Sequence, residues 1–424
     1  MIRIPIERYR LDNGMEIVLS REDAAPVVAL NIWYGVGSRN ERAGRTGFAH
    51  LFEHMMFQGS KHVPEMGHFA LIEKAGGSLN GSTWLDRTNY FETLPANYLE
   101  LGLWLESDRL GWLLPAMTQE KLDNQRDVVK NERRWRVDNQ PYGDWDERIQ
   151  ALMYPPDHPY HHSVIGSMED LDAASLEDVE QFFRTYYAPN NAVLTLCGDF
   201  DPTQARELIA QYFGQLPRGP DIPPIPGRTR LEPVMGGEVR ELVHQDVSLP
   251  RVYVTYRIPP FGGAEYYTAL VTSYILGYGK AALLYRSLVR EQQVAQDVVA
   301  YAFPIVVGAS MLVTWATARP GRSAADVERA FTEQIERLRD VDDADVQRAV
   351  NLLATERLNE LQRLDERADQ LSMYTQLFDE PERINTEVDR IRAVTPQHVR
   401  DFAARYLGTD NRAVLTYVPR EVGA

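Results

Sequence analysis

The chain has 424 residues, of which 44% are hydrophobic and 25% are charged, and its formal net charge is −16. This composition is typical of globular proteins rather than of disordered chains or coiled coils, and the length suffices for two or three domains. The acidic balance argues against a nucleic acid partner, because phosphate binding requires clustered lysine and arginine. No apolar run reaches the ~18 residues that a membrane span requires.

The first residues and the single cysteine give two further expectations. Residues 1–5 contain no apolar stretch followed by a small-residue cleavage site, so no signal peptide is predicted, and the bacterial periplasm and the cytoplasm both remain open as compartments. Cys197 is the only cysteine, which excludes an internal disulfide and a metal cluster of several cysteines. It lies in an apolar run typical of a buried strand, so we expect a small core residue rather than a nucleophile.

Strand and helix patterns are mixed along the first half of the chain. Two strand patterns precede two helical ones, Gly76 and Gly77 then interrupt the chain, and a pair of strands and two longer helices follow. Because these patterns do not alternate strictly, we expect an α+β domain with an antiparallel or mixed sheet. The expected strands are 15–19, 27–34, 78–83 and 88–94, and the expected helices are 47–57, 65–75, 96–110 and 118–137.

A proline-rich segment divides the chain into nearly equal halves. Six prolines and two glycines fall between residues 217 and 233. Prolines at this density prevent helices and central strands, so the segment is predicted to be an extended linker. We therefore expect an N-terminal domain of residues 1–216, a linker of residues 217–233, and a C-terminal domain of residues 234–424.

The two halves repeat one pattern at an offset of about 220 residues. Residues 175–195 contain a serine suited to cap a helix, an amphipathic helix, a turn with an asparagine, and an apolar strand. Residues 395–416 contain the same features in the same order, beginning with a threonine. The strand-like segments 27–34 and 251–256 also correspond. Two matches in the same order predict two homologous domains, each with a mainly antiparallel sheet packed with helices.

The most informative run is Phe48–Phe57, which contains His50, Glu53 and His54. Histidines four residues apart lie on one face of a helix, so two imidazoles can bind one small cation. Glu53 reaches the same side, and a carboxylate beside a metal-activated water can accept the proton released during attack. A chance occurrence of this pattern is the alternative. The apolar neighbours, however, predict that the helix is buried, and a bound metal would satisfy the two imidazoles and the carboxylate inside a core.

The order His-x-x-Glu-His resembles the signature of the pitrilysin/insulinase family of zinc metallopeptidases, the inverzincins. This family includes short bacterial members and the zinc-bearing subunit of the mitochondrial processing peptidase. Its third ligand is a glutamate on a downstream helix, and Glu132, with 77 residues between it and His54, matches that place. The resemblance implies one zinc ion bound by His50, His54 and Glu132, with Glu53 as the base. An ion pair with an arginine is the alternative for Glu132.

Helical periodicity around Glu132 agrees with a position on an inward face. The residues predicted to share that face are Leu122, Gln125, Val128, Val129, Glu132 and Trp135. Gln125 stands where the family often has a second glutamate, seven residues before the ligand. A neutral amide adds no charge near the metal, so a different metal affinity or rate is expected.

Residues 76–83 resemble the turn and edge strand beside the active site of this family. There the substrate adds as an extra strand, and its main-chain hydrogen bonds give affinity with little sequence choice. Asn80 and Gly81 match the positions that hold the substrate backbone. A simple hairpin is the alternative for these two residues. Residues 9–14 resemble the opening strand and turn of the family.

The C-terminal half departs from the family pattern. Active single-chain members have an arginine and a tyrosine seven residues apart that hold substrate and stabilise the oxyanion. Here Val289 and Gln296 occupy those places, and Arg290 is one residue away, which turns it by ~100° on a helix. We therefore expect a zinc endopeptidase subunit that acts on peptides or unfolded polypeptides and is completed by a homologous partner in a heterodimer.

Three alternatives remain to be considered. The first is a monomeric or homodimeric peptidase that uses Gln296 or Arg290 instead. The second is a non-catalytic metal-binding structural subunit, although the retention of Glu53 speaks against it. The third, a serine or cysteine hydrolase, is disfavoured because no Gly-x-Ser-x-Gly motif is present.

A second histidine cluster lies among prolines and is expected to be a loop of surface or structural side chains, namely His158, His161 and His162.

Overall fold

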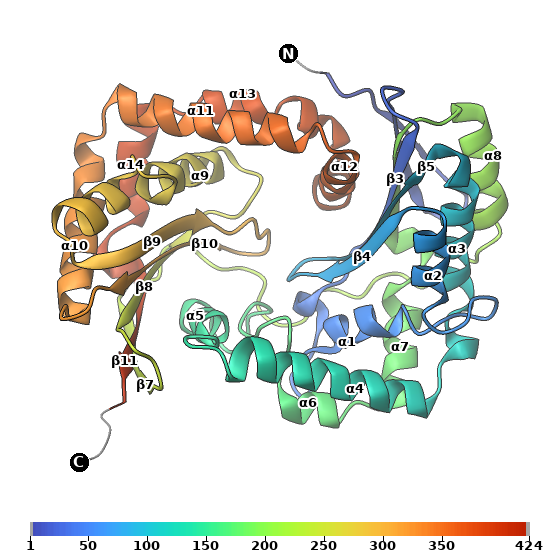
Figure 1. The fold of residues 1–424 in the computed structure, drawn as a ribbon, viewed down its shortest axis with the longest axis horizontal. Coiled ribbons are helices and arrows are strands. Elements are labelled where there is room, and N and C mark those ends of the chain that lie inside the picture. Colours follow the sequence, from blue (N-terminus) through green and yellow to red (C-terminus); the bar gives the residue numbers. More distant parts are fainter. Residues whose placement is uncertain (1–2, 421–424) are drawn as a thin grey trace. The chain divides into compact units, whose positions relative to one another are not determined.

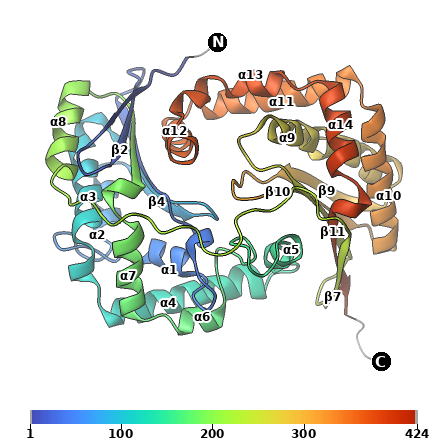
Figure 2. The same ribbon diagram turned by 180° about the vertical axis from the view of Figure 1, so that it is seen from behind.

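The computed structural model describes residues 3–420, which fold into two compact units (Figures 1 and 2). Each unit consists of one mixed sheet and the helices that cover it. Among the described residues, the first unit comprises 3–132, 163–226 and 359–386. The second comprises 133–162, 227–358 and 387–420.

The sheet of the first unit has six strands. Only β2 and β6 run parallel, and the other neighbours are antiparallel, so the expected mixed, mainly antiparallel sheet is confirmed. In spatial order the strands are β1 (Glu7–Arg10), β2 (Glu16–Arg21), β6 (Ala192–Gly198), β3 (Val27–Tyr34), β5 (Thr88–Pro95) and β4 (Ser78–Thr83).

The two faces of this sheet pack differently, because side chains alternate along each strand. On β3, Leu30 and Ile32 belong to the hydrophobic core, whereas Asn31 and Trp33 bond to Asp369 on the other face. Burial of each large apolar side chain contributes about 1.5–3 kcal/mol to stability. The helices of this unit are α1 (Phe48–Met55), α2 (Gly67–Lys74), α3 (Leu99–Trp112), α4 (Gln119–Arg133), α6 (Met168–Asp172), α7 (Leu176–Tyr186), α8 (Pro202–Phe213) and α12 (Leu364–Phe378).

The sheet of the second unit has five strands, of which β7 and β11 run parallel and the others antiparallel. Its strands, in spatial order, are β7 (Val239–Gln245), β11 (Arg412–Pro419), β8 (Arg251–Ile258), β10 (Ser310–Ala318) and β9 (Ala295–Ala302). Its helices are α5 (Trp145–Met153), α9 (Ala264–Gly277), α10 (Ala324–Arg337), α11 (Asp343–Glu360), α13 (Glu387–Arg392) and α14 (Pro396–Tyr406).

The two sheets share one topology, which confirms the predicted duplication. The order β2-β6-β3-β5-β4 in the first unit corresponds to β7-β11-β8-β10-β9 in the second, with the same parallel pair at the start. The repeated helix begins at a capping box in both copies, at Ser175 before α7 and at Thr395 before α14. The first unit has β1 as an additional strand outside β2.

The compact units do not follow the sequence halves strictly. The break between Pro226 and Gly227 lies inside the segment predicted as a linker. Segment 133–162 nevertheless belongs to the second unit, and segment 359–386 to the first, because α5 packs on β8 and β11 while α12 packs on β3 and β6. The contiguous division into residues 1–216 and 234–424 remains a prediction.

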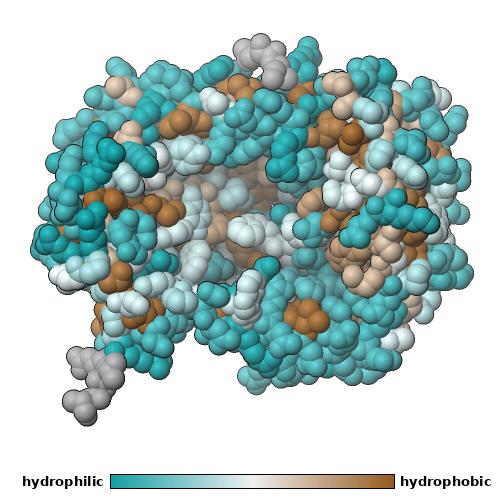
Figure 3. Space-filling model, viewed as in Figure 1, coloured by the Kyte–Doolittle hydropathy of each residue, from teal (hydrophilic) through white to brown (hydrophobic). Residues whose placement is uncertain are grey.

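Within residues 3–420, no helix combines the length and the apolar character needed to cross a membrane. Figure 3 shows hydrophilic residues over much of the face in view, with hydrophobic residues in scattered groups.

Candidate metal centre

The helix α1 places the signature residues beside the sheet of the first unit. It begins after Gly47, whose φ of 85° is a left-handed conformation that glycine adopts without strain. The carboxylate of Glu41 accepts hydrogen bonds from the backbone N–H groups of Gly47 (3.0 Å) and Ala49 (2.7 Å), which satisfies two donors at the start of the helix. Sequence reasoning did not identify Glu41, because the capping residue normally lies adjacent to the helix that it caps.

One face of α1 is anchored in the core and the other carries the polar residues. Leu51, Phe52 and Met55 are fully or almost fully buried. The side chains of His50 and His54 retain 13% and 21% exposure on the other face. Their rings lie 4.9 Å apart between centroids and nearly perpendicular, at 82°. Both imidazoles can therefore reach one small ion.

Glu132 of α4 completes a three-residue group with these histidines. Its Oε2 lies 3.4 Å from Nε2 of His54 and 3.7 Å from Nε2 of His50. Three ligand atoms, one from each residue, lie within 4.8 Å of one another. Tetrahedral zinc with bonds of about 2.1 Å requires ligand atoms about 3.4 Å apart, so this two-imidazole, one-carboxylate set fits that ion.

Glu53 lies beside this group and is held by β4. The hydroxyl of Thr83 donates a 2.6 Å hydrogen bond to Oε2 of Glu53. Burial raises the pKa of the Glu53 carboxyl above its ordinary value, while the bond from Thr83 and the charges of His54 and Arg87 oppose that rise. Sequence reasoning missed Thr83, although its place three residues after Asn80 in the resembling edge strand was a usable signal.

Fewer side chains of α4 and the turn after it are buried than the sequence pattern predicted. Leu122, Gln125 and Val129 are buried, but Val128 is 40% exposed and Trp135 is 66% exposed. The α-helical spacing fails at Trp135 because the helix continues as a π-helical turn from Arg134 to Asp138, which changes the rotation per residue. The prediction that Val128 and Trp135 point inward is therefore wrong.

The two residues expected to bind the substrate backbone lie on β4, at one edge of the first sheet. Asn80 is exposed, and its side-chain oxygen accepts a 2.9 Å hydrogen bond from the N–H of Gly81. A Cβ atom on Gly81 would lie 3.2 Å from the rings of Phe57 and Tyr90 and 3.3 Å from Cγ of Glu53. Glycine therefore allows β4 to approach the base closely.

The region expected to carry the family arginine and tyrosine lies in the second unit. Val289 is buried in a π-helical segment from Tyr285 to Glu291, and Arg290 on the same segment is exposed. Gln296 lies exposed on β9, beyond a left-handed residue, Gln293, with φ of 52°.

The second histidine cluster forms a loop, as predicted. His158 is 2% exposed, its ring stacks on Tyr154 at 4.8 Å, and its Nδ1 accepts a hydrogen bond from the N–H of Tyr160. Burial, followed by the charge of Arg257, lowers the pKa of His158 to about 4. In the described part of the chain, the group formed by His50, His54 and Glu132 is the only one found with metal-binding geometry. His158 is therefore packed and hydrogen-bonded inside this loop, as expected for a structural side chain.

Cys197 is fully buried on β6, as expected for a core residue. Burial raises the pKa of its thiol to about 12, which leaves almost no thiolate at neutral pH. The buried thiol agrees with the expectation of a core residue rather than a nucleophile.

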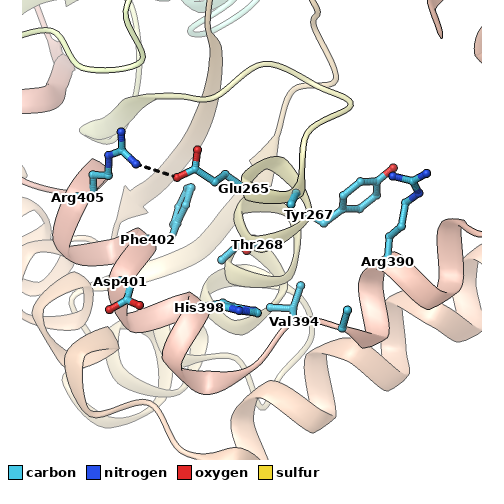
Figure 4. Close-up of a pocket in the computed structure, with 11 residues that line it drawn as sticks. Glu265, Tyr267, Thr268, Arg390, Val394, His398, Asp401, Phe402 and Arg405 are labelled. Carbon is cyan, nitrogen blue, oxygen red and sulfur yellow. Dashed lines mark hydrogen bonds and ion pairs between the residues drawn. The ribbon is translucent and has the colours of Figure 1, made fainter.

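Two further cavities lie at corresponding places in the two units. One, of about 480 Å³, is lined by Phe48 near the start of α1 and by Phe182 on α7. The other, of about 470 Å³, lies between α9 and α14, where Phe402 takes the place of Phe182 (Figure 4). Glu265 and Arg405, which line the second cavity, form an ion pair. The two cavities lie at equivalent positions of the duplicated fold.

Comparisons with known proteins identify the family. Residues 17–153 match the model described as Insulinase (Peptidase family M16), and residues 173–353 match the model described as Peptidase M16 inactive domain. The zinc protease PqqE of Helicobacter pylori is 31% identical over 336 residues, which cover 78% of this chain and 74% of that protein. The chain belongs to peptidase family M16.

Other relatives and structures agree with membership of family M16. The mitochondrial-processing peptidase subunit beta of Blastocladiella emersonii is 25% identical over 277 residues, which cover 64% of this chain and 57% of that subunit. A crystal structure of a protease from Helicobacter pylori has a TM-score of 0.92 at 26% identity and covers 99% of this chain and 100% of its own. An M16 inactive domain from Pseudomonas fluorescens shares the fold, with a TM-score of 0.82 at 17% identity and 99% coverage of both chains.

Proposed function

We propose that this M16 family member is a zinc-dependent endopeptidase subunit that hydrolyses peptides or unfolded polypeptides. His50, His54 and Glu132 would hold one zinc ion, and Glu53 would act as general base. The observation that carries this proposal is the convergence of three ligand atoms from α1 and α4 within 4.8 Å, next to the half-buried carboxylate of Glu53. The names of several relatives as zinc proteases support the choice of metal.

A zinc ion bound in this site would polarise the scissile carbonyl and lower the pKa of a water molecule to ~7. Glu53 then accepts the proton that water loses as it attacks the peptide carbonyl carbon, and it returns that proton to the leaving amine. His50, His54 and Glu132 do not exchange protons in this scheme. These three residues would hold the zinc ion beside α1, at a place where the Glu53 carboxylate can reach the reacting water.

The free edge of β4 is the proposed place for the substrate. An extended peptide can add there as a further strand, with Asn80 and Gly81 bonding its backbone. The support for this role is that β4 ends the six-stranded order and lies directly against Glu53 through Gly81. Recognition of the backbone favours unfolded chains, because a folded protein has few unpaired extended segments to offer.

A homologous partner subunit is proposed to complete the enzyme. Val289 is buried and cannot replace an arginine, and Gln296 lacks the phenol of a tyrosine. Removal of an oxyanion donor typically lowers kcat by ~10²–10³. A homodimer would not restore the pair, because both copies lack it. One relative in the family bears the name of a processing peptidase subunit, which makes a heterodimer a reasonable expectation.

The decisive experiment measures cleavage of a quenched peptide by the zinc-loaded chain, alone and with a co-purifying sister subunit. Glu53→Gln should abolish hydrolysis while the zinc content stays at one ion per chain. Glu73→Gln, which changes an exposed glutamate on α2, is the matched control and should retain full activity. Unchanged hydrolysis in Glu53→Gln would disprove the catalytic assignment, and full activity of the chain alone would remove the need for a partner.

The alternative is a non-catalytic metal-binding subunit of a larger complex. The description of the model matching residues 173–353 as an inactive domain is compatible with it. The retained Glu53, oriented by Thr83 beside the three candidate ligands, favours the enzyme, because a structural metal site needs no base. Zinc binding without hydrolysis, in the presence of the sister subunit, would support the alternative.

A further inference from the structure

The hydrogen bond between Thr83 and Glu53 joins the edge strand to the base. Oγ1 of Thr83 lies 2.6 Å from Oε2 of Glu53, whereas the two other oxygens near it, the Thr88 hydroxyl and the Ala49 carbonyl, lie 3.4 and 3.5 Å away. The hydroxyl therefore donates to the carboxylate. A carboxylate has two oxygens, so this bond engages Oε2 and leaves Oε1 for another partner.

Thr83 is itself held at the end of a rigid hairpin. It lies opposite Thr88 in the antiparallel pair of β4 and β5. Thr88 is fully buried, and its hydroxyl donates to the carbonyl of Val36 at 2.9 Å. The backbone N–H of Trp84 bonds the carbonyl of Arg87 at 2.8 Å, which closes the turn between the strands. The hairpin therefore fixes the main chain that carries the Thr83 hydroxyl.

Arg87 stabilises the same hairpin through hydrogen bonds on the other face of the sheet. Its guanidinium donates to the carbonyl of Ser82 at 2.8 Å and to the Ser82 hydroxyl at 2.5 Å. Arg87 and Ser82 line a small polar cavity of about 150 Å³ together with Asp369 of α12. Asp369 accepts hydrogen bonds from Trp33 (2.7 Å) and Asn89 (2.9 Å), so this wall of the cavity is also fixed.

We propose that Thr83 is a positioning residue that orients the Glu53 carboxylate, so that Oε2 is held by the hydroxyl and Oε1 faces the reacting water. This inference rests on the proposed function, because it assigns Thr83 a role in the same reaction. Gly81, on the same face of β4, contributes by allowing the strand within contact distance of Glu53. Loss of the hydroxyl frees the carboxylate to rotate, and a misplacement of about 1 Å at a catalytic group can cost ~10²-fold in rate.

The test compares two substitutions of Thr83 with a control on the neighbouring strand. Thr83→Val keeps the shape and removes the hydroxyl, whereas Thr83→Ser keeps the hydroxyl. Thr93→Val is the matched control, because Thr93 shares with Asn89 and Phe91 the face of β5 that points away from Glu53. All three variants are measured with the zinc-loaded chain and its partner, where the partner is required, using a quenched peptide.

Thr83→Val should lower kcat by about 10- to 100-fold with KM within about twofold, while Thr83→Ser and Thr93→Val remain within about threefold of the wild type. A Thr83→Val variant with wild-type kcat, or a Thr83→Ser variant as impaired as Thr83→Val, would overturn the proposal.

A readout independent of turnover separates this inference from the proposed function. Crystal structures of the zinc-free wild type, Thr83→Val and Thr83→Ser should show one Glu53 conformer in the wild type and the serine variant, and a rotated or divided carboxylate in the valine variant. An unmoved carboxylate in Thr83→Val overturns the positioning role. An inactive wild type with an ordered Thr83–Glu53 bond would count against the proposed function alone.

Discussion

Asn191 and Asn411 make the same hydrogen bond in the two repeats: Nδ2 of each donates at 2.8 Å to the carbonyl five residues earlier, that of Tyr186 and of Tyr406. Both asparagines are buried and lie directly before the last strand of their repeat in the chain, β6 or β11. The bond satisfies a carbonyl at the end of α7 or α14 and fixes the turn into the strand. This hydrogen bond is a structural feature that the two repeats share.

Replacement of either asparagine by alanine should therefore destabilise the fold without affecting the metal centre. Asn191→Ala should cost about 1–3 kcal/mol, because it leaves a buried carbonyl unsatisfied. Asn411→Ala should cost more, since Asn411 also donates to the carbonyl of Arg257 and accepts from the N–H of Met235. Urea unfolding of both variants checks the order, and an equal or smaller loss for Asn411→Ala would contradict it.

The zinc ligands can be tested by metal content alone. Glu132→Gln should lower zinc affinity by at least about 100-fold, because loss of a hydrogen-bonding partner of a ligand already costs about 10- to 100-fold. Competition with a chromophoric chelator measures the affinity. Glu120→Gln is the control, because Glu120 is exposed on the same helix. Equal zinc affinity in Glu132→Gln and the wild type would show that Glu132 is not a ligand.

Gly81→Ala should impair activity through Glu53. Its new Cβ would meet the rings of Phe57 and Tyr90 at 3.2 Å and Cγ of Glu53 at 3.3 Å, so these neighbours must move by a few tenths of an ångström. We expect a loss of about tenfold in kcat/KM with wild-type zinc content. Steady-state kinetics with metal analysis checks this, and an unchanged kcat/KM would mean that the contact is tolerated.

Cys197 should be inert in the folded protein. With a thiol pKa of about 12, only about 10⁻⁴ of the thiol is ionised at pH 8, and the side chain is fully buried. Labelling with a disulfide reagent should be slower by at least about 100-fold in native protein than in urea, where one equivalent reacts. Rapid labelling of the native chain would indicate local opening around β6.

His158 should make the fold sensitive to acid. Its pKa is about 4 in the fold and about 6.5 in an unfolded chain, so the folded state favours the neutral ring. Its contribution to stability is present above pH 6.5 and is lost as the pH falls toward 4. His158→Asn, which keeps an acceptor and does not titrate, should show a smaller fall in Tm over this range. His244→Asn, at an exposed position on β7, should behave like the wild type.

The sequence alone determined the features that depend on near neighbours. The strand-like residue pattern and the flanking turn residues predicted β3 and β4 with the bounds observed. This was possible because the side-chain pattern of a strand is visible within a few consecutive residues. The spacing of His50, Glu53 and His54 placed them on one side of α1 for the same local reason. The 220-residue offset also predicted a duplication that the two sheet orders confirm.

Tertiary structure decided what depends on the pairing of distant segments. The packing of α12 on the first sheet depends on contacts between residues far apart in the sequence, such as the hydrogen bond between Trp33 and Asp369. Local periodicity does not encode such contacts. The approach of Glu132 to the histidines was suggested by a family resemblance, but only the packing of α4 fixes its distance. The bond from Thr83 to Glu53 depends on the register of an edge strand against a helix, which becomes defined only when the sheet has formed.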